Sequence, residues 1–398
     1  MPDLLDEARW ELEWLLSVQE PGGGFRNTTC QENYGPYGTN LPERMPPYRA
    51  GEVGTVATGR AIGTLAFAST LYRPYDAAFA ERCLEAAQAG YRFLRARPTE
   101  SSDGPTCQAM RQDGNASVGR EVRMYAAAGL LLATGDGRFR ADFEENYQPL
   151  QNDPSFLHSN VYAALLYLRA SAGDPVRQRA IRQDLRHRAE EVLMDGGRHP
   201  FQWAGRTFWG SIAAGFQRTA GFSAQACLED PVGAAADCEQ VLANVHHALG
   251  RNYQQMAYVS GLPGVTRGRS HAFHQWLAAL GAEPFLFPGL VAGGPIAAPE
   301  PNDVTQLHGP IPIWGYWGDP AMPRDASTPL EERYTDNDSW STNELDVDWQ
   351  GVTLYNLYLA RWWAAGPPAQ RATSTSAPRS PSREEQLLDP APPAGQVR

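Results

Sequence analysis

Residues 2–16 of the chain read PDLLDEARWELEWLL, and their apolar side chains recur every three or four positions. That spacing places Leu5, Leu12 and Leu16 on one face of a helix, which is typical of an amphipathic α-helix. The pattern stops at Pro21-Gly22-Gly23-Gly24, a sequence that breaks helices. We therefore expect the chain to begin with a helix.

Similar helical patterns follow along most of the chain. They cover residues 51–73, 76–96, 117–134, 137–147, 156–172, 175–194, 207–220, 232–250 and 345–365, whereas strand patterns are sparse. The links alternate between short and long, as in helical hairpins wound into a toroid with the long loops at one end. A solenoid of helical repeats competes with this architecture, but the sequence shows no fixed repeat length. We predict an all-α toroid.

Two regions interrupt the helical patterns. Residues 251–344 are rich in Gly, Pro and aromatic side chains. Loops of this length inside a compact domain are usually functional or disordered, and the aromatic content argues against disorder. Residues 366–398 change to Pro, Ser, Thr, Ala and Arg, which predicts a disordered tail after a domain over residues 1–365.

The charge of the chain limits its partners. The formal net charge is -11, and every strong base is arginine. Nucleic acids and anionic membranes both require a basic surface, so neither is expected as a partner. No apolar run approaches the ~20 residues of a spanning helix, and no signal peptide precedes the first helix. Either the protein is cytoplasmic or Met1 is not its natural start. We expect a monomer.

The cysteines do not form a metal motif. They are Cys30, Cys83, Cys107, Cys227 and Cys238, with no C-x-x-C pair and no short Cys/His cluster, which argues against zinc. Cys83 lies in a helical pattern and is expected to be a buried thiol. Cys227 and Cys238 flank a link with Pro and Gly and can close a small disulfide loop.

The segment from Tyr334 to Glu344, YTDNDSWSTNE, is the strongest functional signal. It gathers three carboxylates and an indole directly before the last predicted helix. Carboxylic acids grouped in a partly desolvated cleft can stay protonated near neutral pH, and a flat indole suits stacking on a sugar ring. The same residues also suit a helix N-terminus, where Asp, Ser, Thr and Asn cap the backbone.

Several other motifs follow one another in order. They are residues 2–16, Gly23-Gly24-Phe25, Asp76 with Phe79-Ala80, Cys83-Leu84 and Ala86-Ala87, Trp209-Gly210-Ser211, Leu249-Gly250-Arg251-Asn252, Tyr258-Val259-Ser260-Gly261, Gly293-Gly294-Pro295, and Asp338–Glu344 with Asp348. Their order over residues 2–365 resembles glycoside hydrolase family 9, the endoglucanase-type cellulases. The resemblance implies an (α/α)6 barrel of inner and outer helices.

The resemblance also implies roles for individual residues. Glu344 matches the general acid that protonates the departing glycosidic oxygen; a carboxylate at a helix start is the alternative. Trp340 matches an aromatic that lines the cleft, or else it packs in the core. Asp338 orients neighbouring groups, raises the pKa of the acid by like-charge repulsion, or caps the helix. Asn343 stands beside the acid in the substrate-binding segment.

The histidine of the predicted site departs from the family pattern. His271 matches a substrate-binding histidine, but the family has Pro-His-x-Arg where this chain has Ser270-His271-Ala272-Phe273. The missing arginine weakens that subsite, and an unrelated surface histidine is the alternative. Trp314, Tyr316 and Trp317 are further candidates for sugar platforms. The loop between Gly294 and Tyr334 is longer than usual for the family; it either blocks one end of the cleft or is a surface insertion.

A second departure concerns the catalytic base. The family's base lies in an Asp-x-Gly-Asp motif before the first barrel helix, and no such motif occurs in this chain. The chain therefore resembles a domain without its first helix and base. From that we expect a gap in the barrel, with low stability or aggregation, and hydrolysis reduced by at least the ~10²–10⁴-fold that a general base contributes.

The resulting prediction is an inverting hydrolase of β-linked glucans such as cellulose. The alternatives are a carbohydrate-binding pseudoenzyme of the same fold and another helical toroid such as a polysaccharide lyase, whose Tyr/His or Arg base arrangement is not found. No cofactor is required, although loops rich in Asp and Glu leave room for structural calcium. The resemblance favours a secreted natural product that acts on a polysaccharide or oligosaccharide.

Overall fold

The computed structural model describes residues 1–27, 29–30, 49–99, 116–150, 159–205, 211–262, 288–295, 332, 334 and 347–366. Its helices are α1 (Asp3–Ser17), α2 (Thr55–Tyr72), α3 (Ala77–Arg95), α4 (Ala116–Thr134), α5 (Gly137–Asn146), α6 (Asn160–Arg169), α7 (Pro175–Arg198), α8 (Ser211–Arg218), the π-helix η2 (Thr219–Ser223), α9 (Ala224–Glu229), α10 (Ala235–Ala248) and α14 (Val347–Ala364). Two short antiparallel pairs join β1 (Phe25–Arg26) to β4 (Val53–Gly54) and β2 (Thr29–Cys30) to β3 (Arg49–Ala50). The predicted helices are present, with shifted ends.

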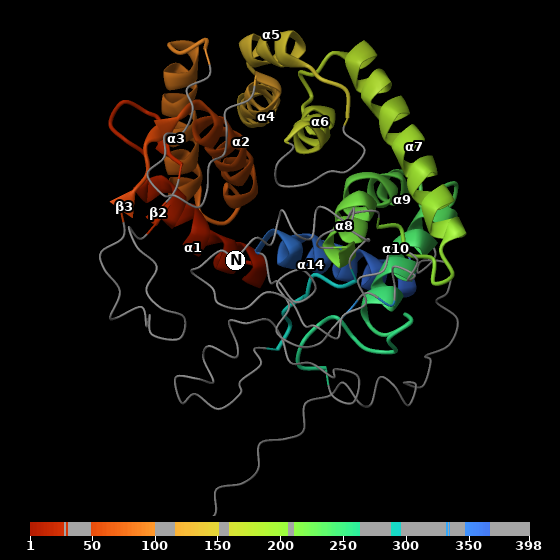
Figure 1. Cartoon of the computed structure of the whole chain (residues 1–398). Coiled ribbons are helices and arrows are strands. Elements are labelled where there is room, and N and C mark those ends of the chain that lie inside the picture. Colours follow the sequence, from red (N-terminus) through yellow and green to blue (C-terminus); the bar gives the residue numbers. More distant parts are fainter. Residues whose placement is uncertain are drawn as a thin grey trace, which may run out of the picture.

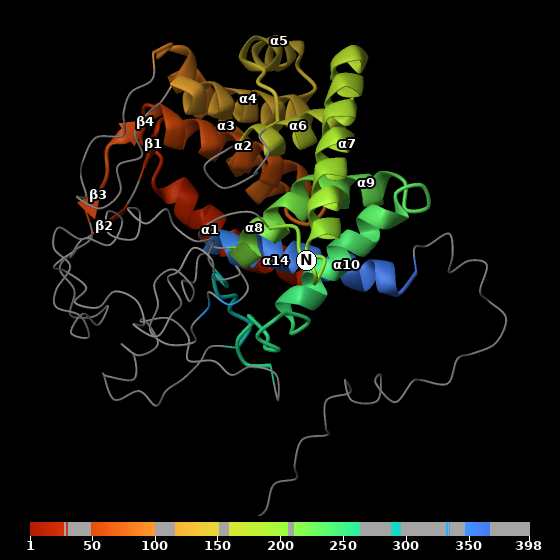
Figure 2. The same cartoon turned by 45° about the vertical axis from the view of Figure 1, so that its right-hand side comes forward.

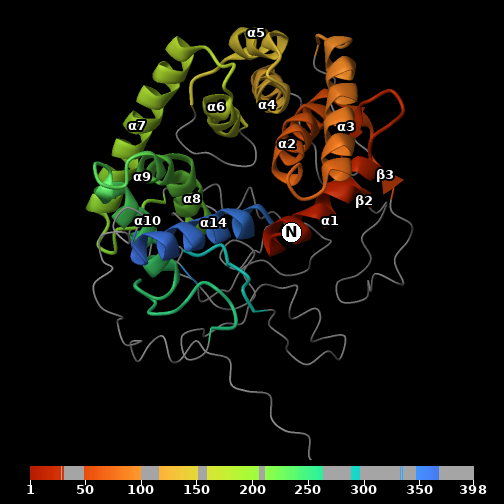
Figure 3. The same ribbon diagram turned by 180° about the vertical axis from the view of Figure 1, so that it is seen from behind.

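The helices form two layers around a common middle. Helices α2, α4, α6, α8 and α14 lie on the inside, and α3, α5, α7 and α10 lie outside them (Figure 1 and Figure 3). Helix α2 packs on α4, α4 on α6, and α8 on α14, while α3 covers α2, α5 covers α4 and α10 covers α14. Figure 2 shows the long α7 standing against α6 and α9. This arrangement is the predicted toroid of helical hairpins.

The turns from inner to outer helices are short and end in an aspartate. Asp76, Asp136 and Asp174 each accept a hydrogen bond from backbone N–H groups in the first turn of α3, α5 and α7. These caps satisfy donors that a helix start leaves unpaired. Gly135 ends α4 with φ +70°, a left-handed conformation that glycine adopts readily. Each hairpin is thus closed tightly at one end of the barrel.

Glycines allow α2 and α4 to pack closely. A Cβ on Gly59 would lie 2.8 Å from Val122, and one on Gly63 would lie 2.3 Å from the ring of Tyr125. Further along, a Cβ on Gly129 would lie 2.8 Å from the carbonyl oxygen of Gly63. Because the contacts advance in the same order along both helices, α2 and α4 run parallel. The N-terminal ends of α2 and α4 therefore lie at the same end of the barrel.

The predicted helix over residues 207–220 differs from the observed one. Within the described residues, the observed helix α8 begins at Ser211 and passes into the π-helix η2 at Thr219. The Thr219 hydroxyl lies 2.9 Å from the Gly215 carbonyl oxygen and 2.7 Å from Oδ1 of Asn356 in α14. A side chain that competes for helix carbonyls favours such a local widening. Tertiary contact with α14 therefore shapes this helix.

Helix α7 continues past the predicted end at residue 194. Its last turn contains Gly196 and Gly197, which indicated a stop in the sequence. A Cβ on Gly196 would lie only 2.0 Å from Oε1 of Gln240 in α10. The glycine therefore allows close contact between two outer helices.

A disulfide joins Cys227 in α9 to Cys238 in α10, and Cys83 is a free, buried thiol. Both findings confirm the sequence interpretation. Burial raises the pKa of the Cys83 thiol to about 11, which keeps it protonated.

Removing the disulfide is expected to lower the free energy of unfolding by about 3 kcal/mol, because a loop of this size restricts the unfolded chain. The measurement is urea unfolding of Cys227→Ala, Cys238→Ala and the double variant. All three should lose a similar amount, since either substitution removes the bond. An unchanged midpoint in the double variant would contradict the assignment.

Candidate active site

In the sequence, the predicted acid segment comes directly before an inner helix. Glu344 comes three positions before Val347, the first residue of α14. The predicted site residues lie outside the described residues: His271, Asp338, Trp340, Asn343 and Glu344, together with Trp314, Tyr316 and Trp317. The described residues nearest to them are Tyr334 and the start of α14 at Val347.

The chain enters the acid segment at Tyr334, which is buried against Tyr258. The two rings meet edge to face, with centroids 5.0 Å apart. Tyr258, only 2% exposed, begins the motif Tyr258-Val259-Ser260-Gly261. Its backbone N–H donates to the carbonyl oxygen of Ala248 at the end of α10, and its carbonyl accepts from the N–H of Ala292. The start of the acid segment is therefore fixed to the barrel wall.

The chain leaves the acid segment through the first turn of α14. Asp348 Oδ2 accepts a hydrogen bond of 2.6 Å from Nε2 of Gln217 in α8. The Gln350 side chain pairs with both backbone groups of Val291, since its Oε1 accepts at 2.8 Å and its Nε2 donates at 3.2 Å. These contacts fix the start of α14 to two neighbouring segments.

The start of α8 is bonded to the same segment as Gln350, which comprises residues 291–295. We call these contacts of Gln217, Gln350 and Ile212 the frame of the acid segment. The N–H of Ile212 donates to the carbonyl oxygen of Gly293 at 3.1 Å. Gly294 has φ +83°, and a Cβ there would lie 2.3 Å from Cγ1 of Ile212. The Gly293-Gly294-Pro295 motif is therefore needed for a close approach to α8. Together with Val291, this segment ties the N-terminal ends of α8 and α14 to each other.

Two tyrosines of the inner helices have buried phenol groups. The Tyr125 hydroxyl in α4 lies 3.4 Å from the Thr64 hydroxyl in α2. Burial raises the pKa of Tyr125, and burial followed by the negative charge of Asp348 raises the pKa of Tyr162 in α6. Both phenols stay protonated at neutral pH and can donate hydrogen bonds. The effect of Asp348 on Tyr162 shows that this phenol lies near the start of α14.

Sequence reasoning missed the anchors Gln217 and Gln350 and the phenol of Tyr162. Each lies in a helical pattern, and its partner in the fold is distant in the sequence, so neighbouring residues do not indicate its role. Gln217 and Asp348 are 131 positions apart, so only the fold brings them together.

No three His, Cys, Asp or Glu side chains within the described ranges are grouped so that they could hold a metal ion. Structural calcium stays a prediction. None of the described helices combines the length and the apolar character needed to cross a membrane.

Comparisons with known proteins agree with one another. The sequence model of the family "Glycosyl hydrolase family 9" matches residues 1–357 of the chain. Endoglucanase D of Acetivibrio thermocellus is 26% identical over 90% of this chain and 52% of its own length, and Endoglucanase C of Cellulomonas fimi is 27% identical over 98% of this chain and 34% of its own. The chain thus spans about half the length of the first of these relatives.

Solved structures share the fold. A metagenome-derived family 9 endoglucanase superposes with a TM-score of 0.76 at 23% identity, covering 90% of this chain and 62% of its own. AaCel9A in complex with cellobiose-like isofagomine superposes with a TM-score of 0.74 at 24% identity, covering 90% of this chain and 66% of its own.

Proposed function

The chain belongs to glycosyl hydrolase family 9, and on that premise we propose that it acts on β-linked glucans by inversion, with Glu344 as the proton donor. The predicted all-α fold of the (α/α)6 type is confirmed by the structural relatives. The relatives named above are endoglucanases, which makes cellulose-like β-1,4-glucans the substrate class of this proposal.

The proposed reaction separates two tasks. Glu344 gives its proton to the glycosidic oxygen as the bond to the anomeric carbon breaks, while water attacks that carbon from the opposite face. An inverting site holds its acid and base carboxyl groups ~6.5–9.5 Å apart to admit this water. Trp340 would stack on a sugar ring, Asp338 would orient the acid, and Asn343 and His271 would bind sugar hydroxyls.

The observation that supports this proposal is the anchoring of Tyr334 and Asp348, which precede and follow Glu344 in the sequence. Tyr334 packs on Tyr258, and Asp348 accepts from Gln217. Glu344 lies between these anchors in the sequence, beside the N-terminal end of α14. Catalytic groups need a rigid support to hold their geometry, and this frame would supply it.

The second candidate function is carbohydrate binding without hydrolysis. It is favoured by the lack of any Asp-x-Gly-Asp motif among the 398 residues, which leaves the chain without the family's base. Under either function we propose a polysaccharide or oligosaccharide partner, a monomeric state, no required cofactor and secretion of the natural product.

Incubation with oligosaccharides tests the substrate class. Cellotetraose should give shorter products, whereas α-linked maltotetraose should stay intact. If both are cleaved, or maltotetraose alone, the proposed class is wrong. If neither is cleaved but cellotetraose binds, the second candidate function is favoured.

Replacing Gln217 by Leu should slow cellotetraose cleavage by about 10–100-fold, because a displaced α14 misplaces the acid and an error of ~1 Å can reduce the rate ~10²-fold. The thermal midpoint should fall only slightly. The matched control is Gln225→Leu, since Gln225 also donates to α14, through the Tyr355 hydroxyl at 3.2 Å, but farther from its start. Equal rates in both variants would contradict a positioning role for Gln217.

A further inference from the structure

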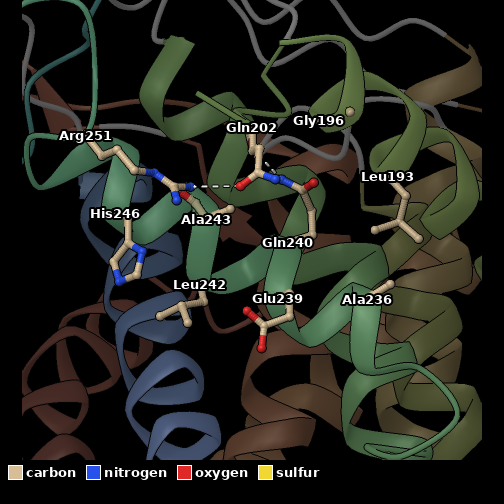
Figure 4. A pocket seen from close by; sticks show the side chains of 11 residues that line it. Leu193, Gly196, Gln202, Ala236, Glu239, Gln240, Leu242, Ala243, His246 and Arg251 are labelled. Carbon is tan, nitrogen blue, oxygen red and sulfur yellow. Dashed lines mark hydrogen bonds between the residues drawn. The ribbon is translucent and has the colours of Figure 1, made fainter. Parts of the chain in front are cut away.

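A pocket opens between the outer helices α7 and α10 (Figure 4). Its volume is about 580 Å³, within the range of small-molecule sites. Leu193 of α7 and Ala236, Leu242 and Ala243 of α10 give it an apolar lining. The pocket is therefore suited to a ligand with apolar faces.

A buried amide presents an unused acceptor at this pocket. Gln240 is 6% exposed, and its Nε2 donates to the Gln202 carbonyl oxygen at 2.7 Å and to Oδ1 of Asn244 at 3.0 Å. Its Oε1 points towards Gly196, as Figure 4 shows, and accepts no hydrogen bond from the residues that the structure describes. A buried carbonyl of this kind favours a ligand that donates a hydrogen bond.

The guanidinium group of Arg251 supplies hydrogen-bond donors at the other end of the pocket. Nη2 of Arg251 donates to Oε1 of Gln202 at 3.2 Å, whereas its contacts with the carbonyl oxygens of Phe201 and Ala243 are 3.4 and 3.5 Å long. The guanidinium therefore keeps donor capacity for a ligand. Gln202 has φ +57°, an uncommon conformation for a residue with a side chain, which its hydrogen bonds hold in place.

The pocket carries no net charge at neutral pH. The positive Arg251 is matched by Glu239, which also accepts a hydrogen bond from the Trp363 indole at 2.9 Å. Burial, followed by the charge of Arg251, lowers the pKa of His246, so its imidazole is neutral. A charged ligand would add a charge that no group of the pocket balances, whereas a neutral ligand would leave the charges of Arg251 and Glu239 matched.

We propose that this pocket binds a short neutral oligosaccharide. A hexose ring has apolar C–H faces for the Leu and Ala lining and hydroxyl groups on its edge. The hydroxyls would donate to Gln240 Oε1 and to Glu239, and would accept from Arg251. Its lining residues come from α7, α10 and the positions just after these helices, so the site does not include Glu344 and does not depend on the proposed hydrolysis.

The test is calorimetric titration of the full chain with cellobiose. Ala236 is exposed on α10 at the pocket, so Ala236→Phe fills the pocket without disturbing the core. Ala78→Phe makes the same change at an exposed position in the first turn of α3 and serves as the control. Ala236→Phe should weaken one class of cellobiose sites by at least about tenfold, and Ala78→Phe should not.

The rate of cellotetraose cleavage separates this site from the proposed catalytic cleft. If Ala236→Phe weakens one class of cellobiose sites and keeps its cleavage rate, the outer pocket is that site. If Ala236→Phe binds cellobiose as the wild type does, or if the wild type binds none, the proposal is overturned. Neither of these results bears on Glu344.

Discussion

Azide ions should accelerate the cleavage of cellotetraose by this chain, by up to the ~10²–10⁴-fold that a general base typically contributes. The chain contains no Asp-x-Gly-Asp motif, so no residue of that motif can activate water. Azide is already an anion and attacks carbon without losing a proton. It therefore replaces both the water and the base while the proposed acid keeps its role.

The product identifies the reaction. Azide nitrogen forms a bond to the anomeric carbon, the bond from that carbon to the glycosidic oxygen breaks, and Glu344 supplies the proton to the departing oxygen. Attack opposite a β-linked leaving group gives an α-glycosyl azide, which proton NMR and mass spectrometry detect. If no glycosyl azide forms and the rate does not rise, the hydrolase proposal loses to the carbohydrate-binding alternative.

The second large effect is expected from Glu344→Gln, which should slow cellotetraose cleavage by about 10²–10⁴-fold with or without azide. The amide cannot donate the proton that a sugar leaving group needs. The leaving group of 2,4-dinitrophenyl cellobioside departs without a proton. With this substrate and azide, Glu344→Gln should keep most of the cleavage rate of the wild-type chain. That contrast separates loss of the acid from loss of the fold.

A matched control for this variant is Glu332→Gln, a partly exposed glutamate just before Tyr334. It should leave both substrates unaffected. If Glu344→Gln cleaves cellotetraose as fast as Glu332→Gln does, Glu344 is not the acid.

The helical fold could be predicted because its signals are local. Apolar periodicity marks α1, and the Asp76, Asp136 and Asp174 caps mark the starts of outer helices within a few residues of the positions they bond. The disulfide between Cys227 and Cys238 spans 11 positions, a separation short enough to suggest it from the sequence.

Features that depend on distant partners could not be predicted. The π-helix at Thr219 depends on Asn356, 137 positions away, and the last turn of α7 depends on Gln240 lying against Gly196. The frame around the acid segment likewise joins Gln217 to Asp348 and Gln350 to Val291. Glu344, His271, Trp340, Asp338 and Asn343 come from the motif resemblance, and their roles stay predictions.

The central claim is that the Glu344 carboxyl group reaches the glycosidic oxygen of a bound glucan. A crystal structure of the Glu344→Gln variant with cellotetraose tests it most directly. The proposal predicts the residue 344 side chain within about 2.6–3.2 Å of a glycosidic oxygen, with a sugar ring on Trp340. A side chain directed into the apolar interior, with cellotetraose bound elsewhere, would contradict it.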